Sequence, residues 1–181
     1  LAGGGVVRSG AGPEIAELAE KLNIPVATSL NAKAMLPDRH PLNVGVPGAY
    51  SRDCANRTLA EADLVFFVGS HAGGQVTNNW MFPPAGTKVI QLDIDPYELG
   101  RNYPNAVSIM GDAKVSLRRI IAAASARTTA ASTAWGKRTQ QLVAEWRGAK
   151  EEMRGAKVSQ IRRERMCKCV CGFVRADGCE D

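Results

Sequence analysis

Two apolar runs in the middle of the sequence constrain the fold more than any other feature. The first reads ADLVFFVGS at 62–70 and stops at a glycine, and the second reads KVIQLDIDP at 88–96 and ends in two carboxylates and a proline. Both runs are short, rich in β-branched and aromatic residues, and bounded by turn-forming residues, which predicts two buried strands. Because apolar residues are nearly continuous instead of alternating, both faces of each strand should be covered, as in a parallel sheet flanked by helices.

The sequence before these runs predicts a further unit of strand, glycine-rich turn, helix and strand. Residues 1–7 are typical of a strand end that runs into a glycine-rich turn, and a helix should begin at Pro13, which suits a first helical turn. Apolar residues from Ile15 to Leu22 recur at three- and four-residue spacing and give this helix a buried face. Residues 24–28 read IPVAT, a short strand, so a right-handed crossover is expected between the two strands.

Several shorter elements are predicted around the two apolar runs. A helical turn is expected at 31–36, a helix at 52–60 with Ser51 as its N-cap, and one more helical turn at 97–102. A strand is expected at 106–110 and a helix at 113–124. Gly111 and Asp112 lie between them and should cap the helix. The residues of that helix expected to face inward are Val115, Leu117, Ile120 and Ile121.

A change of composition marks the predicted domain boundary. Residues 122–133 are almost entirely alanine, serine and threonine, which is typical of a linker, and 135–154 are helix-prone. We therefore expect a Rossmann-like domain at 1–124, a linker and helix at 125–160, and a stub of a further domain or an irregular tail at 161–181.

The ends of the predicted strands carry the candidate ligand-binding residues, because ligands of open parallel sheets bind beyond the carboxyl ends of the strands. The glycines at 3–5 have two interpretations: a turn that lets helix and strand pack closely, or a turn whose amides approach a nucleotide phosphate. They do not form a G-x-G-x-x-G fingerprint, so the residues alone favour packing. Nothing in the sequence pairs His71 with a carboxylate, and we interpret it as a polar loop residue.

Charge and hydropathy limit the partners of the chain. The net charge of +5 comes from its end, because residues 1–120 carry 11 basic and 11 acidic side chains whereas 121–181 carry 12 and 7. A basic tail can contact nucleic acid, but here it lacks aromatic interleaving and any recognised motif, so nucleic-acid binding is not expected. No apolar run reaches eighteen residues, so no membrane span is expected either.

Four cysteines crowd the last fifteen residues: Cys167, Cys169, Cys171 and Cys179. Thiolates can bind Zn²⁺ or Cu(I), but structural zinc sites separate paired ligands by two to four residues, which this spacing does not match. The abrupt change of composition is what a shifted reading frame would produce, and we favour that interpretation over a metal site.

Six motifs in the first two thirds of the chain keep the order of a known family. They are GGG at 3–5, IPVATS at 24–29, NVGVPG at 43–48, ADLV at 62–65 continuing to Gly69, LDIDP at 92–96 and GD at 111–112. Over about residues 1–120 the chain resembles the central domain of thiamine-diphosphate enzymes of the acetolactate synthase, benzoylformate decarboxylase and pyruvate decarboxylase group. The resemblance implies that the chain is a fragment of such an enzyme.

The resemblance implies an α/β fold, a Rossmann-like parallel sheet of six strands with helices on both faces, as the middle of three domains. A C-terminal helical tail should follow. Only Leu1 and Ala2 precede the glycines, so the first strand, which should lie in mid-sheet, is expected to be truncated. Shortening a central strand leaves backbone groups of its neighbours unpaired, and we expect marginal stability of the isolated chain.

The resemblance also assigns the cofactors and partners. In such enzymes thiamine diphosphate and Mg²⁺ bind between the outer two domains of paired subunits, and the activating glutamate and the G-D-G motif belong to those domains. No catalytic or metal-binding residue is therefore expected in this chain, which should be inactive alone. The expected partners are the other domains of a parent enzyme that forms a homodimer or homotetramer in the cytoplasm.

Some members of the family hold FAD or ADP in the central domain. By position, the nucleotide-facing residues would be Gly4, Gly5, Thr28, Ser29, Leu30, Gly45, Gly48, Gly69, Ser70, Asp93, Ile94, Asp95 and Asp112. Flavin-binding synthases carry an arginine and paired aspartates after the glycine that matches Gly69, whereas this chain reads SHAGGQ at 70–75. A tightly held FAD is therefore not expected.

The sequence leads to one principal function and two alternatives. The principal one is a spacer or nucleotide-binding-like domain of a decarboxylase or carboligase that acts on 2-keto acids. The alternatives are a free-standing module that binds FAD, ADP or NAD on the same sheet, and a protein that interacts through its basic tail.

Overall fold

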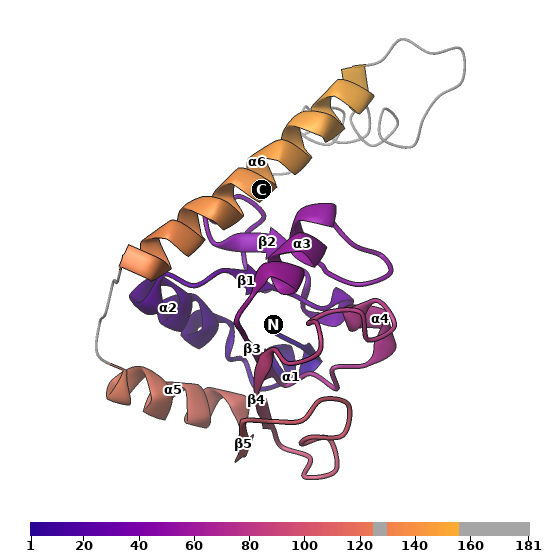
Figure 1. The fold of residues 1–181 in the computed structure, drawn as a ribbon. Coiled ribbons are helices and arrows are strands. Elements are labelled where there is room, and N and C mark those ends of the chain that lie inside the picture. Colours follow the sequence, from indigo (N-terminus) through magenta and orange to yellow (C-terminus); the bar gives the residue numbers. More distant parts are fainter. Residues whose placement is uncertain (125–129, 156–181) are drawn as a thin grey trace, which may run out of the picture. The chain divides into compact units, whose positions relative to one another are not determined.

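The computed structural model describes residues 1–124 and 130–155 of the chain (Figure 1). The chain divides into two compact units, 1–143 and 144–181, and all of the sheet belongs to the first. Much of the predicted linker and the whole of the predicted cysteine-rich tail lie outside the described residues.

The described chain alternates short strands with helices. The strands are β1 (Val26–Ala27), β2 (Asn43–Gly45), β3 (Leu64–Val68), β4 (Lys88–Asp93) and β5 (Val107–Met110). The helices are α1 (Gly4–Arg8), α2 (Gly12–Leu22), the 3-10 turn η1 (Leu30–Ala32), α3 (Asp53–Glu61), α4 (Gly74–Thr77), α5 (Ala113–Ala123) and α6 (Ala130–Gly155).

The predicted parallel sheet is confirmed. β3 pairs in parallel with β4, beginning with Leu64 opposite Lys88, and β4 pairs in parallel with β5. β1 and β2 form a second parallel pair. Ala2 makes parallel bridges to both Thr28 and Val68, so it joins the two pairs in the order β2, β1, Ala2, β3, β4, β5. Residues 1–2 thus hold the central position of the sheet, and we call them the strand stub.

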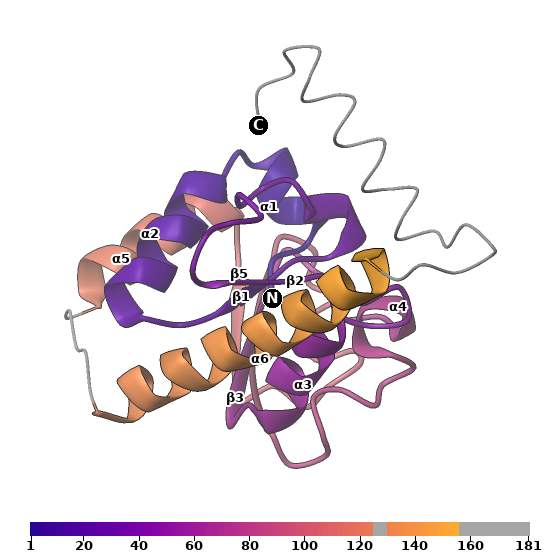
Figure 2. The ribbon, with the colours of Figure 1, turned by 90° about the horizontal axis from the view of Figure 1, so that it is seen from above.

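Helices cover the sheet on both faces, which confirms the predicted α/β class. Figure 2 shows α2 and α5 on one side of the strands and α3 on the other. The buried stripe of α2, which includes Ile15 and Leu18, forms one core cluster with Leu92 of β4 and with Leu117 and Ile121 of α5. The apolar runs of β3 and β4 are nearly continuous because the side chains on both faces of these strands are packed against helices.

Two predictions about helix ends were wrong. Residues 4–8 form a short helix where a glycine-rich turn was predicted, because Gly3 N–H already ends the strand by donating to Val68 O and the helix starts directly behind it. The N-cap of α3 is Arg52, not Ser51, and Arg52 has extended backbone without a side-chain cap.

Two further predictions were wrong, and one strand was not predicted. Val115 is 52% exposed, because two residues along a helix turn its side chain about 200° away from buried Leu117. Residues 96–100 form turns with i→i+3 bonds and no helix, and they end at Gly100, whose φ is +76°. The strand β2 was missed, because its three residues are extended by pairing with β1 and not by any pattern of their own.

The described residues include no helix with the length and apolarity that a membrane span requires.

Candidate functional site

A hollow of about 560 Å³ lies where the carboxyl ends of the strand stub and β3 meet α1. It is lined by Gly3, Gly4, Gly5, Val7, Arg8, Ser29, Asn31, Gly69, Ser70, His71, Ala72, Gly73, Gln75 and Val76. The position agrees with the rule that ligands of open parallel sheets bind beyond the carboxyl ends of the strands. Its size is within the range of small-molecule sites.

Two of the three consecutive glycines are required by backbone packing. A Cβ on Gly3 would lie 2.1 Å from Gly69 O, and a Cβ on Gly5 would lie 2.8 Å from Gly69 Cα. Gly69 itself has φ +54° and would meet Gly5 Cα at 2.7 Å. The start of α1 therefore lies directly against the end of β3, and the packing interpretation of these glycines holds for Gly3 and Gly5.

Gly4 is different, because it leaves room on the side of the hollow. A Cβ there would meet only the Asn31 side chain, at an ordinary 3.4 Å. Next to it, the buried Ser29 hydroxyl has no hydrogen-bond partner within the described part of the chain. An unpaired buried hydroxyl costs free energy, and a ligand group or water at the hollow would satisfy it.

The charge of the hollow is low. Arg8 is the one arginine or lysine among its lining residues, and no carboxylate lines it. No group of three or more metal-ligating side chains occurs in the parts of the chain that the structure describes. The lining can therefore accept an anionic or neutral ligand, with one guanidinium to oppose its charge, but it does not supply a metal site.

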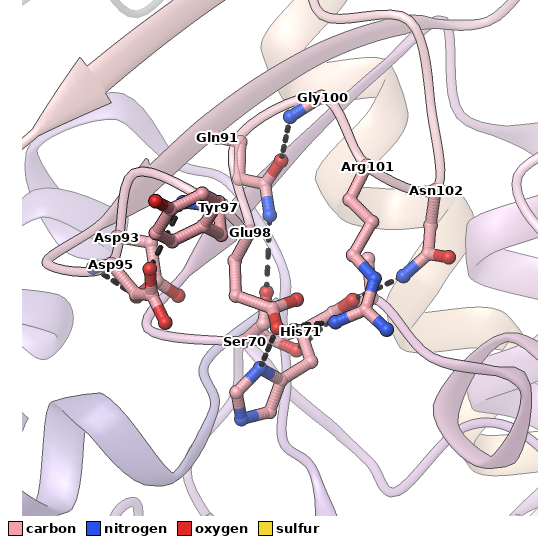
Figure 3. A network of polar contacts seen from close by, with 11 residues as sticks. Ser70, His71, Gln91, Asp93, Asp95, Tyr97, Glu98, Gly100, Arg101 and Asn102 are labelled. Atoms are coloured by element: carbon pink, nitrogen blue, oxygen red, sulfur yellow. Dashed lines mark hydrogen bonds and ion pairs between the residues drawn. The ribbon is translucent and has the colours of Figure 1, made fainter.

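His71 is held by a carboxylate from the next loop, contrary to the prediction that it has none. Its Nδ1 lies 3.1 Å from Glu98 Oε1, and the Arg101 guanidinium donates to the same oxygen at 2.7 Å (Figure 3). The Glu98 side chain is only 8% exposed, whereas the other two are largely in solvent. Glu98 Oε2 has no partner among the described residues. The carboxylate thus fixes the imidazole at the rim of the hollow.

Hydrogen bonds between side chains and backbone groups connect the same two loops. Asn102 Nδ2 donates to His71 O at 2.7 Å, and buried Gln91 receives Gly100 N–H at 2.9 Å and donates to Ser70 O at 3.4 Å (Figure 3). The loop after β4 therefore supports the loop after β3. We define this set of contacts, from Ser70 and His71 to Gln91, Glu98, Gly100, Arg101 and Asn102, as the rim network.

The structure brings five of the thirteen candidate residues together and separates the others. Gly4, Gly5, Ser29, Gly69 and Ser70 line the hollow. Leu30 lines a neighbouring hollow of about 40 Å³, and Thr28 and Gly45 line another of about 490 Å³ that includes Arg52. Gly48 packs against the backbone of α4, where a Cβ would lie 1.9 Å from Gln75 O.

The acidic candidates satisfy local backbone groups. Asp93 accepts the Asp95 N–H at 3.1 Å, and Asp95 accepts the Tyr97 N–H at 2.9 Å, so both carboxylates stabilise the turn after β4 (Figure 3). Ile94 between them is 70% exposed. Asp112 is the N-cap of α5 and accepts the Val115 N–H at 3.0 Å, as the predicted capping role requires. None of these four lines the hollow.

Sequence reasoning missed Arg8, Asn31 and Gln75 as lining residues. The sequence contained a signal for Arg8, because it lies only three residues after the glycines at the end of the first strand. Asn31 and Gln75 follow the ends of β1 and β3, which the strand-end rule also covers. The buried Cys54 is no nucleophile, since burial raises the pKa of its thiol and Sγ donates to Val44 O at 3.4 Å.

Comparison with known proteins agrees with this geometry. Residues 1–120 match the family described as thiamine pyrophosphate enzyme, central domain. The chain is 38% identical over 142 residues to a probable acetolactate synthase large subunit of Methanocaldococcus jannaschii, which is 78% of this chain and 24% of that protein. It is 40% identical over 121 residues to the corresponding protein of Methanococcus aeolicus, covering 67% of this chain and 20% of the relative.

A bacterial relative gives the same result. An acetolactate synthase of Mycobacterium bovis is 39% identical over 120 residues, which is 66% of this chain and 19% of the relative. The chain thus spans about a fifth to a quarter of the length of these relatives. The parallel sheet, the glycine-lined strand ends and the matched residues agree, and the chain belongs to the family of thiamine pyrophosphate enzyme central domains.

Proposed function

We propose that this chain acts as the central domain of a decarboxylase or carboligase of the acetolactate synthase type, which uses thiamine diphosphate and Mg²⁺ on 2-keto acids. The observation that carries the proposal is the family match over residues 1–120, supported by acetolactate synthases at 38–40% identity. In this function the domain separates the catalytic domains and holds them at a fixed spacing.

The chemistry of the whole enzyme would come from groups outside the described residues. Thiamine diphosphate, when bound in such an enzyme, stabilises the carbanion that decarboxylation of a 2-keto acid requires. The described residues provide no cluster of three metal ligands, so they do not fit the Mg²⁺ and diphosphate site. Their contribution is structural, and it rests on the rigid sheet and on the surfaces that it presents.

Exposed apolar side chains support contacts with the other domains of a parent enzyme. Ile94, Tyr97 and Met110 are 70%, 85% and 67% exposed, and all three lie at or just after the carboxyl ends of β4 and β5. Large apolar side chains in solvent at one edge of a sheet are typical of an interaction surface. We propose that this edge packs against partner domains in a cytoplasmic homodimer or homotetramer.

A chimera tests the assignment to the family of synthases. Residues 1–120 would replace the matched segment of the Methanocaldococcus enzyme, and acetolactate formation from pyruvate would be measured with thiamine diphosphate and Mg²⁺. A functional central domain should retain assembly and a substantial share of the activity. A chimera that assembles normally, by size-exclusion chromatography, but has no activity would contradict the proposal.

The isolated chain provides the opposite test. The purified protein, supplied with thiamine diphosphate and Mg²⁺, should turn over neither pyruvate nor benzoylformate, while an intact acetolactate synthase serves as the positive control. Measurable turnover by the isolated chain would show that a complete catalytic site lies within it.

A free-standing FAD, ADP or NAD module is the second candidate, and the hollow is the observation in its favour. The unpaired Ser29 hydroxyl and the open side of Gly4 suit a nucleotide, but Arg8 alone opposes the charge of a diphosphate. Calorimetric titration with each nucleotide separates the two functions. Micromolar binding that Ser29→Ala weakens would favour the module, and no heat of binding would favour the spacer.

A further inference from the structure

The hollow of about 490 Å³ at the carboxyl ends of β1 and β2 is a separate site, because it shares no lining residue with the hollow beside α1. We call it the Arg52 hollow. It is lined by Thr28, Lys33, Ala34, Leu36, Pro37, Asp38, Asn43, Gly45, Val46 and Arg52. Its volume is within the range of small-molecule sites.

The Arg52 hollow has an excess of positive charge. Its lining includes two cationic side chains, Lys33 and Arg52, and one carboxylate, Asp38. Arg52 Nη2 donates to Asp38 Oδ1, so the carboxylate of this same chain already occupies the guanidinium. Lys33 leaves one further positive charge at the hollow, which attracts an anion.

The two partners of this ion pair differ in burial. The Arg52 side chain is only 19% exposed, whereas that of Asp38 is 64% exposed. Arg52 crosses the end of β2 at Gly45, where a Cβ would lie 2.4 Å from Arg52 Cδ, and its backbone N–H donates to Val46 O at 2.8 Å. The guanidinium is therefore part of the wall, and the Asp38 carboxylate lies at the mouth.

Buried Asn43 holds the wall in place up to the residue before Asp38. Its Nδ2 donates to Leu36 O at 3.2 Å and to Pro37 O at 3.0 Å, and its Oδ1 accepts Gly45 N–H at 2.8 Å. Asp38 follows in an exposed turn that the His40 N–H to Pro37 O bond closes. Because none of these bonds involves the Asp38 side chain, this side chain can leave Arg52 while the wall stays intact.

The rest of the lining is apolar. Leu36 and Val46 are 3% and 6% exposed, and Ala34 and Pro37 lie beside them in the same hollow. A ligand that fits this lining has an aliphatic body and one anionic group, because a buried apolar wall offers few partners to further polar groups.

We propose that the Arg52 hollow binds a small aliphatic carboxylate. The carboxylate of the ligand replaces that of Asp38 on the Arg52 guanidinium, whose fork of N–H donors matches two carboxylate oxygens. Lys33 adds a second positive charge, and the apolar side chains contact the hydrocarbon body. Asp38 is thus an intramolecular competitor of the ligand. The inference does not depend on the proposed function.

A simple carboxylate tests the proposal on the full chain. The probe is 4-methylpentanoate at pH 7, and the readout is the NMR signal of the Arg52 side-chain Nε–H in the labelled protein. We expect a saturable shift with a Kd of about 1 mM, since the probe has few atoms and must displace Asp38. Neutral 4-methylpentanamide, which has the same size and shape, should give no saturable shift.

Two pairs of variants separate specific contacts from overall charge. Asp38→Asn removes the competitor and should tighten binding about threefold, because the exposed ion pair that the ligand replaces is weak. Asp53→Asn removes the same charge from an exposed neighbour outside the lining and should leave the Kd unchanged. Lys33→Gln should weaken binding about threefold, whereas Arg39→Gln, outside the lining, should not.

Four outcomes would overturn the proposal. Equal binding of the amide would show an apolar cavity that does not recognise an anion. Tighter binding of inorganic phosphate than of 4-methylpentanoate would show a phosphate site in place of a carboxylate site. Equal Kd values for the Asp38→Asn and Asp53→Asn variants would show that Asp38 does not compete. No saturable shift up to about 50 mM probe, in the parent or in Asp38→Asn, would show that the hollow binds no such ligand.

Discussion

The two ends of β1 and β3 contain cavities of opposite character. At the carboxyl ends, glycine backbone packs against glycine backbone, and the hollow beside it is lined by glycines, by polar and small apolar side chains and by a single arginine. At the amino ends, a second cavity of about 310 Å³, which we call the slot, is lined almost entirely by apolar side chains, including Ile15 and Leu18 of α2 and Leu59 of α3. The same two strands therefore border a hollow with polar groups at one end and an apolar cavity at the other.

The difference follows from what occupies the central position of the sheet. Beyond Ala2 the chain turns into α1, so the carboxyl end is closed by a helix that requires glycine at its contacts. At the amino ends of β1 and β3, side chains of α2 and α3 surround an open space. Substitutions at the carboxyl end should thus change the free energy of unfolding through backbone clashes and lost polar contacts. Substitutions at the amino end should change it through the burial of apolar side chains.

The largest effect is expected at the glycine contact of the carboxyl end. Gly3→Ala would place a Cβ 2.1 Å from Gly69 O, a clash with backbone that side-chain movement cannot relieve. We expect a loss of roughly 4 kcal/mol in the free energy of unfolding, or failure to fold, by urea denaturation. Gly73→Ala is the matched control, because nothing lies within 4 Å of its Cβ, and it should change stability by less than about 0.5 kcal/mol. Equal effects of the two would refute the packing role of Gly3.

The features that could be predicted from the sequence are those determined by residues close together in the chain. The apolar runs at 62–70 and 88–96 identified β3 and β4. Asp112 was recognised as a cap because the amide that it accepts, Val115 N–H, lies only three residues away. The convergence of Gly4, Ser29 and Gly69 at one hollow followed from the rule for strand ends.

Features that were not predictable depend on partners distant in the sequence. β2 is extended because it pairs with β1, and α1 begins at Gly4 because β3 fixes the residue before it. The contact of His71 with Glu98 arises only when the loops after β3 and β4 are brought side by side. The Asp93 carboxylate had the right position for a ligand, yet it accepts a backbone amide two residues away.

The second effect tests the rim network at the polar end. Glu98→Gln retains the shape of the side chain but removes the charge that both Arg101 and His71 contact. Because those two partners are largely exposed, solvent screens the ion pairs, and we expect a loss of only about 1 kcal/mol in the free energy of unfolding. Glu17→Gln, on the exposed face of α2, should change it by a few tenths. A larger loss at Glu17 would contradict the assigned role of the network.

The smallest effect is expected near the slot, where Arg138 fixes the beginning of α6 to the end of α3. Its Nε and Nη2 donate to the two Glu61 oxygens at 2.8 and 2.7 Å, and this bidentate bond lowers the pKa of Glu61. Both side chains are about one third exposed, so Glu61→Gln should cost only about 0.5 kcal/mol. The contribution of the pair is present above the ordinary pKa of glutamate and is lost as the pH falls below it, so the variant and the parent should converge in acid. The same variant also tests the wall of the slot, because Trp135 lies one helical turn before Arg138 and lines this cavity. If Glu61→Gln changes the fluorescence emission of Trp135 as well as stability, the ion pair positions Trp135 in the wall of the slot. If the emission is unchanged, packing alone positions it.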